Sequence, residues 1–154
     1  MSIEAVRSYF RPLGRETDIL EFSESSATVE LAAQAVGVIP ARIAKSLSFL
    51  TPEGCVLIIA AGDARVDNSK YKHHFGVKAK MLTPEQVVEY TGHAIGGVCP
   101  FAISRPDVRI YLDISLQRFD TVFPAAGSAN SAIELTCVEL EQYACNCQGW
   151  QTEE

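Results

Sequence analysis

Two adjacent glycines head the segment of this sequence that is best suited to contact a ligand. Residues 96–101 read Gly-Gly-Val-Cys-Pro-Phe. Glycine loses more backbone entropy on ordering than other residues, so a pair of them suits a turn with positive φ or a place where a ligand approaches main-chain N–H groups. Pro100 fixes its own φ and lacks an N–H donor, which favours a sheet edge or a bulge. We interpret Gly96 and Gly97 as the rim of a pocket, with a plain turn before a strand as the alternative.

A lysine provides the second candidate group. Lys45 is flanked by Ala44 and Ser46 at the entrance of an alternating apolar segment. Its ammonium is a point charge that can bind a phosphate or a reacting ester. The alternative is a solvated lysine at the end of a strand.

Charged and small residues follow two of the apolar segments. Residues 62–67 (Gly-Asp-Ala-Arg-Val-Asp) come directly after a continuous apolar run, and loops in that position commonly carry binding groups. Residues 125–131 (Ala-Ala-Gly-Ser-Ala-Asn-Ser) allow close backbone approach and bring hydroxyl and N–H donors together. The candidates are Gly62, Asp63, Arg65, Gly127 and Ser128.

The cysteines do not form a recognisable metal or nucleophile motif. Five cysteines and three histidines show no zinc-like pair of pairs, and there is no Gly-x-Ser-x-Gly turn. Cys99 lies in the pocket segment without an identified base, so we interpret it as a small apolar wall residue rather than a nucleophile. Cys145 and Cys147 are assigned to a partly exposed tail, with a redox or metal role as the alternative. We expect no metal and no organic cofactor.

Composition limits the possible partners. The chain has 154 residues and a formal charge of −6, which predicts one domain and argues against broad binding to a nucleic-acid backbone such as DNA. One local basic cluster remains, made of Lys70, Lys72, His73, His74, Lys78 and Lys80. No apolar run reaches the length of a membrane span and no secretory signal is visible, so we expect a cytoplasmic protein without membrane contact.

Capping and stop residues predict where the helices begin and end. A first helix is expected from Ser2, its cap, to a stop at Pro12 and Gly14, and a second from about Thr28 to a C-terminal cap at Gly37. Asn68 is the expected cap of a third helix. The Thr83 and Thr136 capping boxes begin two more, which run to Gly92 and through Tyr143.

Apolar runs predict the strands. The expected strands cover residues 19–22, 46–50, 55–61, 78–82, 109–113 and 132–135. The second and third are joined by residues 51–54 and predict a hairpin whose second strand is buried on both faces.

The order of the motifs carries a resemblance to a known family. Lys45 is followed by Gly62-Asp63-x-Arg65, then by Thr91-Gly92-His93-x-x-Gly96-Gly97-Val98-x-Pro100-Phe101, then by Ala126-Gly127-Ser128. This order resembles the bacterial YbaK/ProX-type editing domains, the free-standing relatives of the insertion domain of prolyl-tRNA synthetase. The resemblance spans roughly residues 6–143 of a single domain over residues 1–154.

The resemblance implies both fold and reaction. It implies a compact α/β (α+β) domain with a mixed, strongly curved sheet partly wrapped by helices, and trans-editing hydrolysis of the ester on mischarged tRNA of the Cys-tRNA(Pro) or Ala-tRNA(Pro) type. Lys45 would be the family's catalytic lysine. The implied substrate contacts are Ser46, Gly62, Asp63, Arg65, His93, Gly96, Gly97, Cys99, Pro100, Phe101, Gly127 and Ser128.

The remaining expectations concern detail within this site. Gly96 and Gly97 would expose N–H groups to the ester carbonyl or ribose, while Cys99 and Ser46 would shape the end of the pocket that takes the amino acid. Lys70 and Lys72 would bind acceptor-stem phosphates. Ala102 replaces a glycine found in many relatives, and Ser46 and Asn130 fall at positions that vary, so the amino acid, the tRNA and any docking to an aminoacyl-tRNA synthetase stay open.

Two other functions remain open. A non-catalytic module that binds a nucleotide or an RNA end would use the same pocket. A hydrolase of a free small ester is the third possibility.

Overall fold

A twisted mixed sheet forms the centre of the computed structural model, which describes residues 2–151. Within these residues the sheet has six strands in the order β7-β5-β2-β3-β4-β8. They are β2 (Ile43–Thr51), β3 (Gly54–Ala61), β4 (Val108–Asp113), β5 (Thr121–Pro124), β7 (Leu135–Thr136) and β8 (Cys147–Gln151). β2 and β3 are antiparallel, whereas β3–β4, β4–β8 and β2–β5 are parallel. β1 (Ile19–Glu21) and β6 (Ser131–Ile133) form a separate antiparallel pair. The predicted mixed α/β fold is confirmed.

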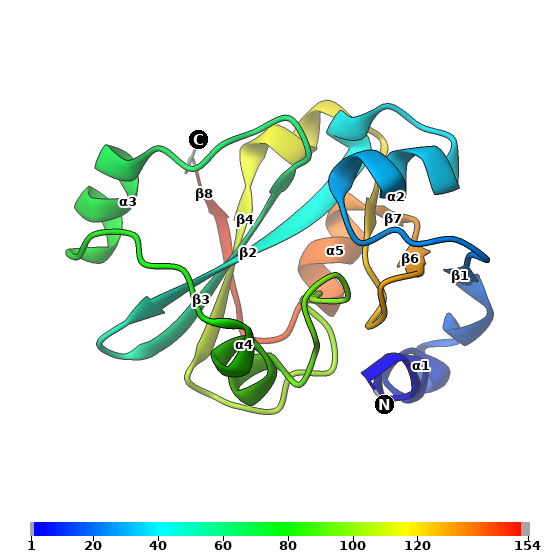
Figure 1. The fold of residues 1–154 in the computed structure, drawn as a ribbon, viewed down its shortest axis with the longest axis horizontal. Coiled ribbons are helices and arrows are strands. Elements are labelled where there is room, and N and C mark those ends of the chain that lie inside the picture. The colour runs from blue at the N-terminus through cyan, green and yellow to red at the C-terminus, as the bar shows by residue number, and fades with distance from the viewer. Residues whose placement is uncertain (1, 152–154) are drawn as a thin grey trace.

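Helices surround this sheet. They are α1 (Ser2–Phe10), α2 (Val29–Val36), α3 (Asn68–Phe75), α4 (Pro84–Thr91) and α5 (Cys137–Tyr143), with 3₁₀ turns at Arg11–Leu13, Glu16–Asp18, Pro40–Arg42 and Ile114–Arg118. α1 and α3 lie at opposite ends of the long axis (Figure 1). Within residues 2–151, no helix has the length and apolar character needed to cross a membrane.

Burial on both faces of β3 explains its continuous apolar sequence. All eight residues of this strand are buried. Leu57 and Ile59 pack in the cluster that also contains Val6 of α1 and Leu140 of α5. The alternate residues Val56 and Ile58 pack in a second cluster with Tyr71 of α3, Phe49 and Tyr111. The two-residue period of a strand therefore divides β3 between two cores.

The structure confirms most of the expected helix ends. Thr83 and Thr136 each form the predicted capping box, and Gly37 and Gly92 cap their helices in the left-handed conformation. The predicted cap at Asn68 is wrong by one residue. The carboxylate of Asp67 accepts the Lys70 N–H at 2.8 Å, so the helix begins one residue earlier.

Two strand predictions need correction. Residues 78–82 do not form a strand but pair with β2 through one bridge, between Phe49 and Met81. The segment that was expected to be a partly exposed tail instead contains β8, whose Trp150 pairs with Leu112 of β4. β8 was not predicted because Gly149 and polar residues break its apolar pattern. In addition, a parallel edge strand forms its hydrogen bonds with a segment that is distant in the sequence.

Candidate functional site

A cavity of about 260 Å³ opens beside β2. Its walls come from β2, the segment that leads into α2, the N-terminal side of α4, the loop after α4, and β5 and β6. Much of the lining is apolar and includes Val29, Ile43, Leu82, Val87, Ile95, Val98 and Phe123. The polar side chains on the walls are those of Ser26, Thr28, Lys45, Ser46, Ser48 and Ser131.

Lys45 lines this cavity, and its ammonium is bound by the turn after β3. It lies in β2 opposite Ala60 of β3, and its Nζ donates to the carbonyl of Gly62 at 3.3 Å and to that of Ala64. Burial lowers the pKa of this ammonium below its ordinary value, the charge of Asp63 opposes that effect, and Arg65 reinforces it. The two carbonyls hold the cation against the turn after β3, and a negative ligand beside it would offset its loss of hydration.

The turn after β3 supplies the two carbonyls that Lys45 contacts. A Cβ added at Gly62 would lie 2.1 Å from the Pro40 carbonyl oxygen, so only glycine fits. Asp63 accepts two hydrogen bonds from Arg118, at 2.6 and 3.1 Å, and this partner holds the pKa of the Asp63 carboxyl below its ordinary value. Asp63 and Arg65 are exposed beside the turn rather than on the cavity wall.

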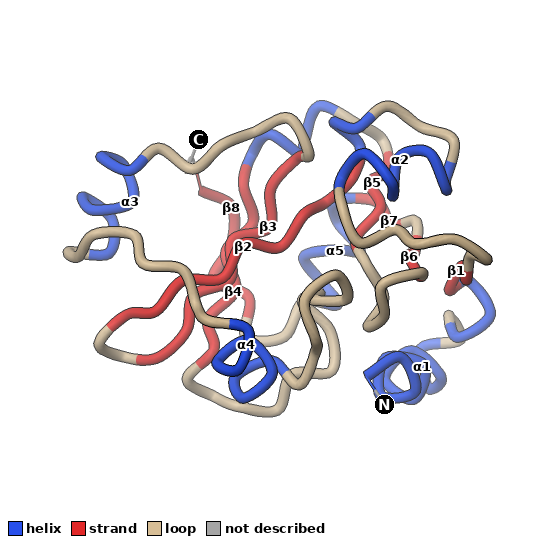
Figure 2. Tube along the Cα trace, viewed as in Figure 1, coloured by secondary structure: helices blue, strands red, loops and turns tan. Residues whose placement is uncertain are grey.

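The loop from residue 92 to 107 carries the glycine pair and contains no helix or strand (Figure 2). Gly96 has φ +93° and lines the cavity. A Cβ added at Gly96 would contact the side chains of Ala27 and Ala129. Gly97 is buried behind it, and its N–H donates to the Ala94 carbonyl at 3.0 Å. The expectation of a free N–H is therefore wrong for Gly97, which serves to bring two backbones together.

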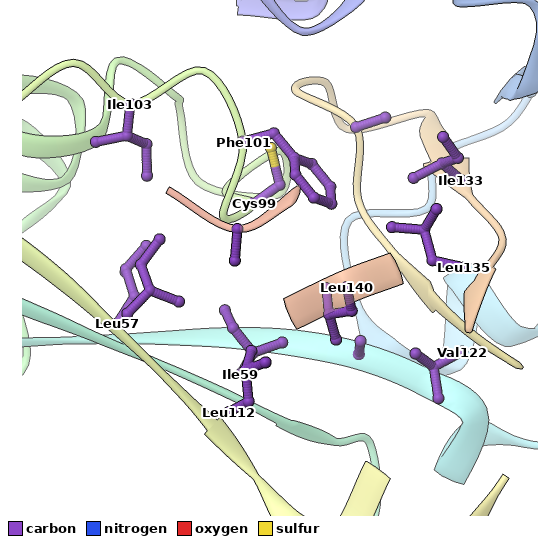
Figure 3. Packing of buried hydrophobic residues seen from close by; sticks show 14 of the residues in the cluster. Leu57, Ile59, Cys99, Phe101, Ile103, Leu112, Val122, Ile133, Leu135 and Leu140 are labelled. Carbon is purple, nitrogen blue, oxygen red and sulfur yellow. The ribbon is translucent and has the colours of Figure 1, made fainter. Parts of the chain in front are cut away.

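Cys99 and Phe101 lie in the core rather than on the cavity wall (Figure 3). Both side chains are fully buried, in the same cluster as Leu57, Ile59 and Leu140. Burial raises the pKa of the Cys99 thiol to about 12, so the thiol stays protonated at neutral pH. Pro100 is also buried. The expectation that Cys99 shapes the pocket directly does not agree with this position.

His93 stabilises the loop of residues 92–107 from within the core. It is 1% exposed, and its Nε2 lies 2.8 Å from the Phe101 carbonyl and 3.5 Å from Cys99 Sγ. Burial lowers the pKa of His93, which favours the neutral ring with Nε2–H donating to that carbonyl. We assign His93 to the positioning of the loop.

The small-residue run holds the opposite wall. Ser128 N–H donates to Ser131 Oγ at 3.2 Å, and Ser128 Oγ lies 2.7 Å from the same oxygen. Asn130 Nδ2 donates to the Phe22 carbonyl, and Ser26 N–H donates to the Ala129 carbonyl at 2.6 Å. Ala129 and Asn130 thus tie the segment before α2 to this wall, and Gly127 and Ser128 do not line the cavity themselves.

The predicted site residues fall into three groups. Lys45, Ser46 and Gly96 line the cavity, and the residues around them, from Gly62 to Arg65 and from Gly97 to Phe101, build its supports. Lys70 and Lys72 lie on α3, and Lys72 lines a separate hollow of about 370 Å³ with Lys78. Residues 68–75 are not among those that form the main cavity.

Sequence reasoning missed Ser26, Thr28 and Ser48 on the walls. The only local signal for Ser26 is a serine-rich turn before α2, made of Ser23, Ser25 and Ser26, and such a turn is typical of an ordinary chain connection. Ser48 falls two residues after Ser46, so the period of a strand places both on one face of β2.

Comparison with known proteins agrees with this arrangement. The model of the family described as "Aminoacyl-tRNA editing domain" matches residues 23–143. The chain is 54% identical to the uncharacterized protein YwhH of Bacillus subtilis, over 98% of this chain and 100% of that protein. It is 32% identical to the multifunctional Ser/Thr-tRNA deacylase ProXp-y of Escherichia coli, over 58% of this chain and 54% of that protein.

Longer proteins and solved structures extend the comparison. A proline–tRNA ligase of Thermotoga maritima is 31% identical over 58% of this chain, which matches only 15% of the ligase. A crystal structure described as a proposed trans-editing enzyme for prolyl tRNA synthetase superposes with a TM-score of 0.87 at 32% identity, covering 99% of this chain and 97% of that one. The family model covers most of the chain, including Lys45 and the whole cavity wall. The chain therefore belongs to the aminoacyl-tRNA editing domain family.

Proposed function

We propose that this protein is a trans-editing aminoacyl-tRNA deacylase. Its substrate is a tRNA that carries the wrong amino acid, and its reaction is hydrolysis of the ester between that amino acid and the terminal ribose. The observation that carries the proposal is a cavity lined by Lys45, whose ammonium is partly desolvated, together with apolar residues and hydroxyl groups. The membership of the editing family and the relatives that act on mischarged tRNA support it.

The reaction needs few groups from the protein. A water molecule, or a neighbouring ribose hydroxyl in a first step, adds to the ester carbonyl, and the bond from the carbonyl carbon to the ribose oxygen breaks. The products after hydrolysis are the free amino acid and a tRNA with its terminal hydroxyl restored. Lys45 would stabilise the negative charge on the reacting ester or bind the terminal phosphate. A protonated, buried Cys99 is unsuited to a covalent mechanism.

The cavity volume suits a small amino acid. Small-molecule sites typically measure roughly 300–1,000 Å³, so a cavity of about 260 Å³ favours a short side chain over a bulky one. Cys-tRNA(Pro) and Ala-tRNA(Pro) remain the predicted substrates, and the seryl and threonyl esters belong in the same test. We further propose that the acceptor end of the tRNA is the main contact, in the cytoplasm, with residues 1–154 acting as one domain.

The test is a deacylation panel. Purified protein is mixed with tRNAs that carry alanine, cysteine, serine or threonine, and with correctly charged Pro-tRNA(Pro) as a control. Enzyme-dependent release of at least one wrong amino acid, with proline left in place, would establish the function. If the protein binds these tRNAs but releases none of the amino acids, the chain is a non-catalytic module that recognises the RNA end.

A further inference from the structure

The mouth of the cavity beside β2 is apolar. Within residues 2–151, the lining residues that are exposed to solvent are Ala27, Thr28, Met81 and Ile95. Met81 is 61% exposed and Ile95 is 62% exposed, whereas the other large apolar side chains of the lining are buried or half-buried. Residues that line a cavity and also face solvent lie at its mouth. We call Ala27, Met81 and Ile95 the apolar rim.

Pairing with β2 fixes the position of Met81. The Leu50 N–H donates to the Lys80 carbonyl at 2.8 Å, and the Leu82 N–H donates to the Ser48 carbonyl at 3.2 Å. Side chains alternate along such a paired segment, so Leu82 packs into the wall at 8% exposed while Met81 faces solvent. The exposure of Met81 is therefore set by the backbone.

A tight turn presents Ile95 at the same mouth. The Gly97 N–H donates to the Ala94 carbonyl at 3.0 Å, which places Ile95 and Gly96 at the two central positions of the turn. Gly96 has φ +93°, and a type II turn requires a positive φ at that position. Ile95 is thus held at the corner of the turn, next to the glycine that lines the cavity.

The substrate of the proposed reaction must pass this mouth. The cavity of about 260 Å³ favours a short aminoacyl group, and the larger terminal nucleoside is joined to that group through the ester. The nucleoside then lies at the apolar rim. Its base has a flat face, and proteins bind such faces with apolar and aromatic side chains.

The chemistry of the mouth fits a base and not a phosphate. The apolar rim carries no charge, and the neighbouring Thr28 Oγ1 already accepts the Leu31 N–H at 3.2 Å as the cap of α2. Phosphates are attracted to cations such as the exposed Arg65. Contact between a base and the apolar rim removes apolar surface of both from water, which is favourable.

We propose that Met81 and Ile95 bind the face of the terminal nucleobase of the tRNA and so direct the ester of the same nucleotide into the cavity. This inference rests on the proposed deacylase function. It predicts that the protein distinguishes an aminoacyl nucleoside from the same ester on a sugar without a base. A protein partner seated on the apolar rim would cover the mouth through which the substrate must enter.

The experiment compares two minimal esters of the amino acid that the deacylation panel releases fastest. One is the ester with adenosine, and the other is the ester with anhydroribitol, the same sugar ring without the base. The variants are Met81→Gln, Ile95→Thr and the double substitution. The matched control is Val88→Thr, because Val88 of α4 is 50% exposed but does not line the cavity.

Wild-type protein should prefer the adenosine ester by at least about tenfold in kcat/KM. The double variant should lose most of this preference, mainly through a higher KM for the adenosine ester, while the anhydroribitol ester changes less than about threefold. Val88→Thr should treat both esters as wild type does. Thermal melting shows that each variant folds, since polar substitutions at exposed positions change stability little.

Three results would overturn the proposal. Equal rates for the two esters in wild type would mean that the base makes no contact. An equal fall for both esters in the double variant would show that Met81 and Ile95 shape the cavity itself. An effect that is confined to whole aminoacyl-tRNA, and absent from the adenosine ester, would assign the apolar rim to another part of the tRNA or to a protein partner.

The inference can also be tested if the protein is no deacylase. If wild type hydrolyses no mischarged tRNA and neither minimal ester, the proposed function fails. Calorimetry with the 3′-amide analogue of alanyl-adenosine and the matching amide of anhydroribitol then decides the inference. Tighter binding of the adenosine analogue, lost in the double variant, supports contact with the base, whereas equal affinities overturn it.

Discussion

Gly97 lies directly against the backbone of Ser128. A Cβ placed on Gly97 would stand 2.7 Å from Ser128 N and 2.8 Å from Ser128 Cα, with the carbonyl carbon of Gly127 also at 2.7 Å. At Gly97, the loop that carries Gly96 and the run that holds the opposite wall thus meet through main-chain atoms. Neither segment can yield by turning a side chain.

We expect Gly97→Ala to separate these two segments. The methyl group would push the Gly96 turn away from Ser128, which should lower turnover of every mischarged tRNA at least about tenfold, because small misplacements in a site have large effects on rate. The control is Gly92→Ala, where φ is +76° but no atom lies within 4 Å of the added Cβ. That variant should lose only about 1 kcal/mol of stability and keep its activity. Equal losses from both substitutions would contradict the close packing.

Lys45→Met tests the role of the buried cation. Methionine retains an unbranched stem but removes the charge, so we expect the fold to persist while deacylation falls at least about tenfold. Because burial lowers the pKa of Lys45, binding of a non-hydrolysable analogue should weaken as pH rises through a value below the usual lysine range. The Met variant should lack this pH dependence. Near-normal turnover in folded Lys45→Met would exclude the ammonium from the mechanism.

His93 predicts a loss of stability in acid. Burial lowers the pKa of His93 in the folded protein below its ordinary 6.5, so the unfolded chain takes up the proton at a higher pH than the folded one. The stability that neutral, buried His93 contributes is therefore complete above about pH 6.5 and is lost as the pH falls below that value. Denaturant unfolding at pH 7 and pH 5 should show a smaller difference for His93→Gln than for wild type. His73→Gln, on exposed α3, is the control and should match wild type.

Cys99→Ala should cost stability rather than activity. The side chain is fully buried among apolar residues, so removing its sulfur should lower the free energy of unfolding by about 1–2 kcal/mol. Deacylation rates and the order of preferred amino acids should be unchanged, since Cys99 does not line the cavity. Complete loss of activity in a folded variant would instead identify the thiol as a nucleophile.

The lysines of α3 are expected to contact the tRNA beyond its terminal nucleotide. Replacing Lys70 and Lys72 together with alanine should weaken tRNA binding and reduce its salt dependence, while a substrate that carries only the terminal nucleotide should bind as before. Arg11→Ala, in the 3₁₀ turn that directly follows α1, is the control. Filter binding across a range of salt concentrations provides the measurement. An unchanged salt slope would mean that these lysines only face solvent.

Local signals in the sequence were enough for elements whose ends depend on neighbouring residues. The capping boxes at Thr83 and Thr136 and the left-handed cap at Gly37 involve atoms within a few residues, and all three were predicted. β8 depends on hydrogen bonds to β4, and its own sequence carries little of that information. The same distinction separates the predicted cap at Asn68 from the observed one at Asp67, where two adjacent residues can both cap and the turn geometry decides.

The candidate site shows the same limit. Lys45 and the glycine pair could be selected because their residue types are unusual in their positions. Ser26 could not, because its place in the cavity depends on the Ala129 carbonyl, about a hundred residues along the chain. Cys99 was placed on the wall because it neighbours the glycines in sequence, whereas the turn at Gly96 directs it into the core.

The parallel pairings of the sheet should also govern how fast the chain folds. Within residues 2–151, only the β2–β3 hairpin closes through a tight turn, whereas the parallel pairings join distant residues, such as Cys55 with Val108 and Ile43 with Phe123. Loop-closure entropy delays such non-local contacts, and proteins dominated by them fold on the order of milliseconds to seconds. The hairpin that carries Lys45 can therefore form early, whereas the cavity beside it is completed only when the distant strands have joined the sheet.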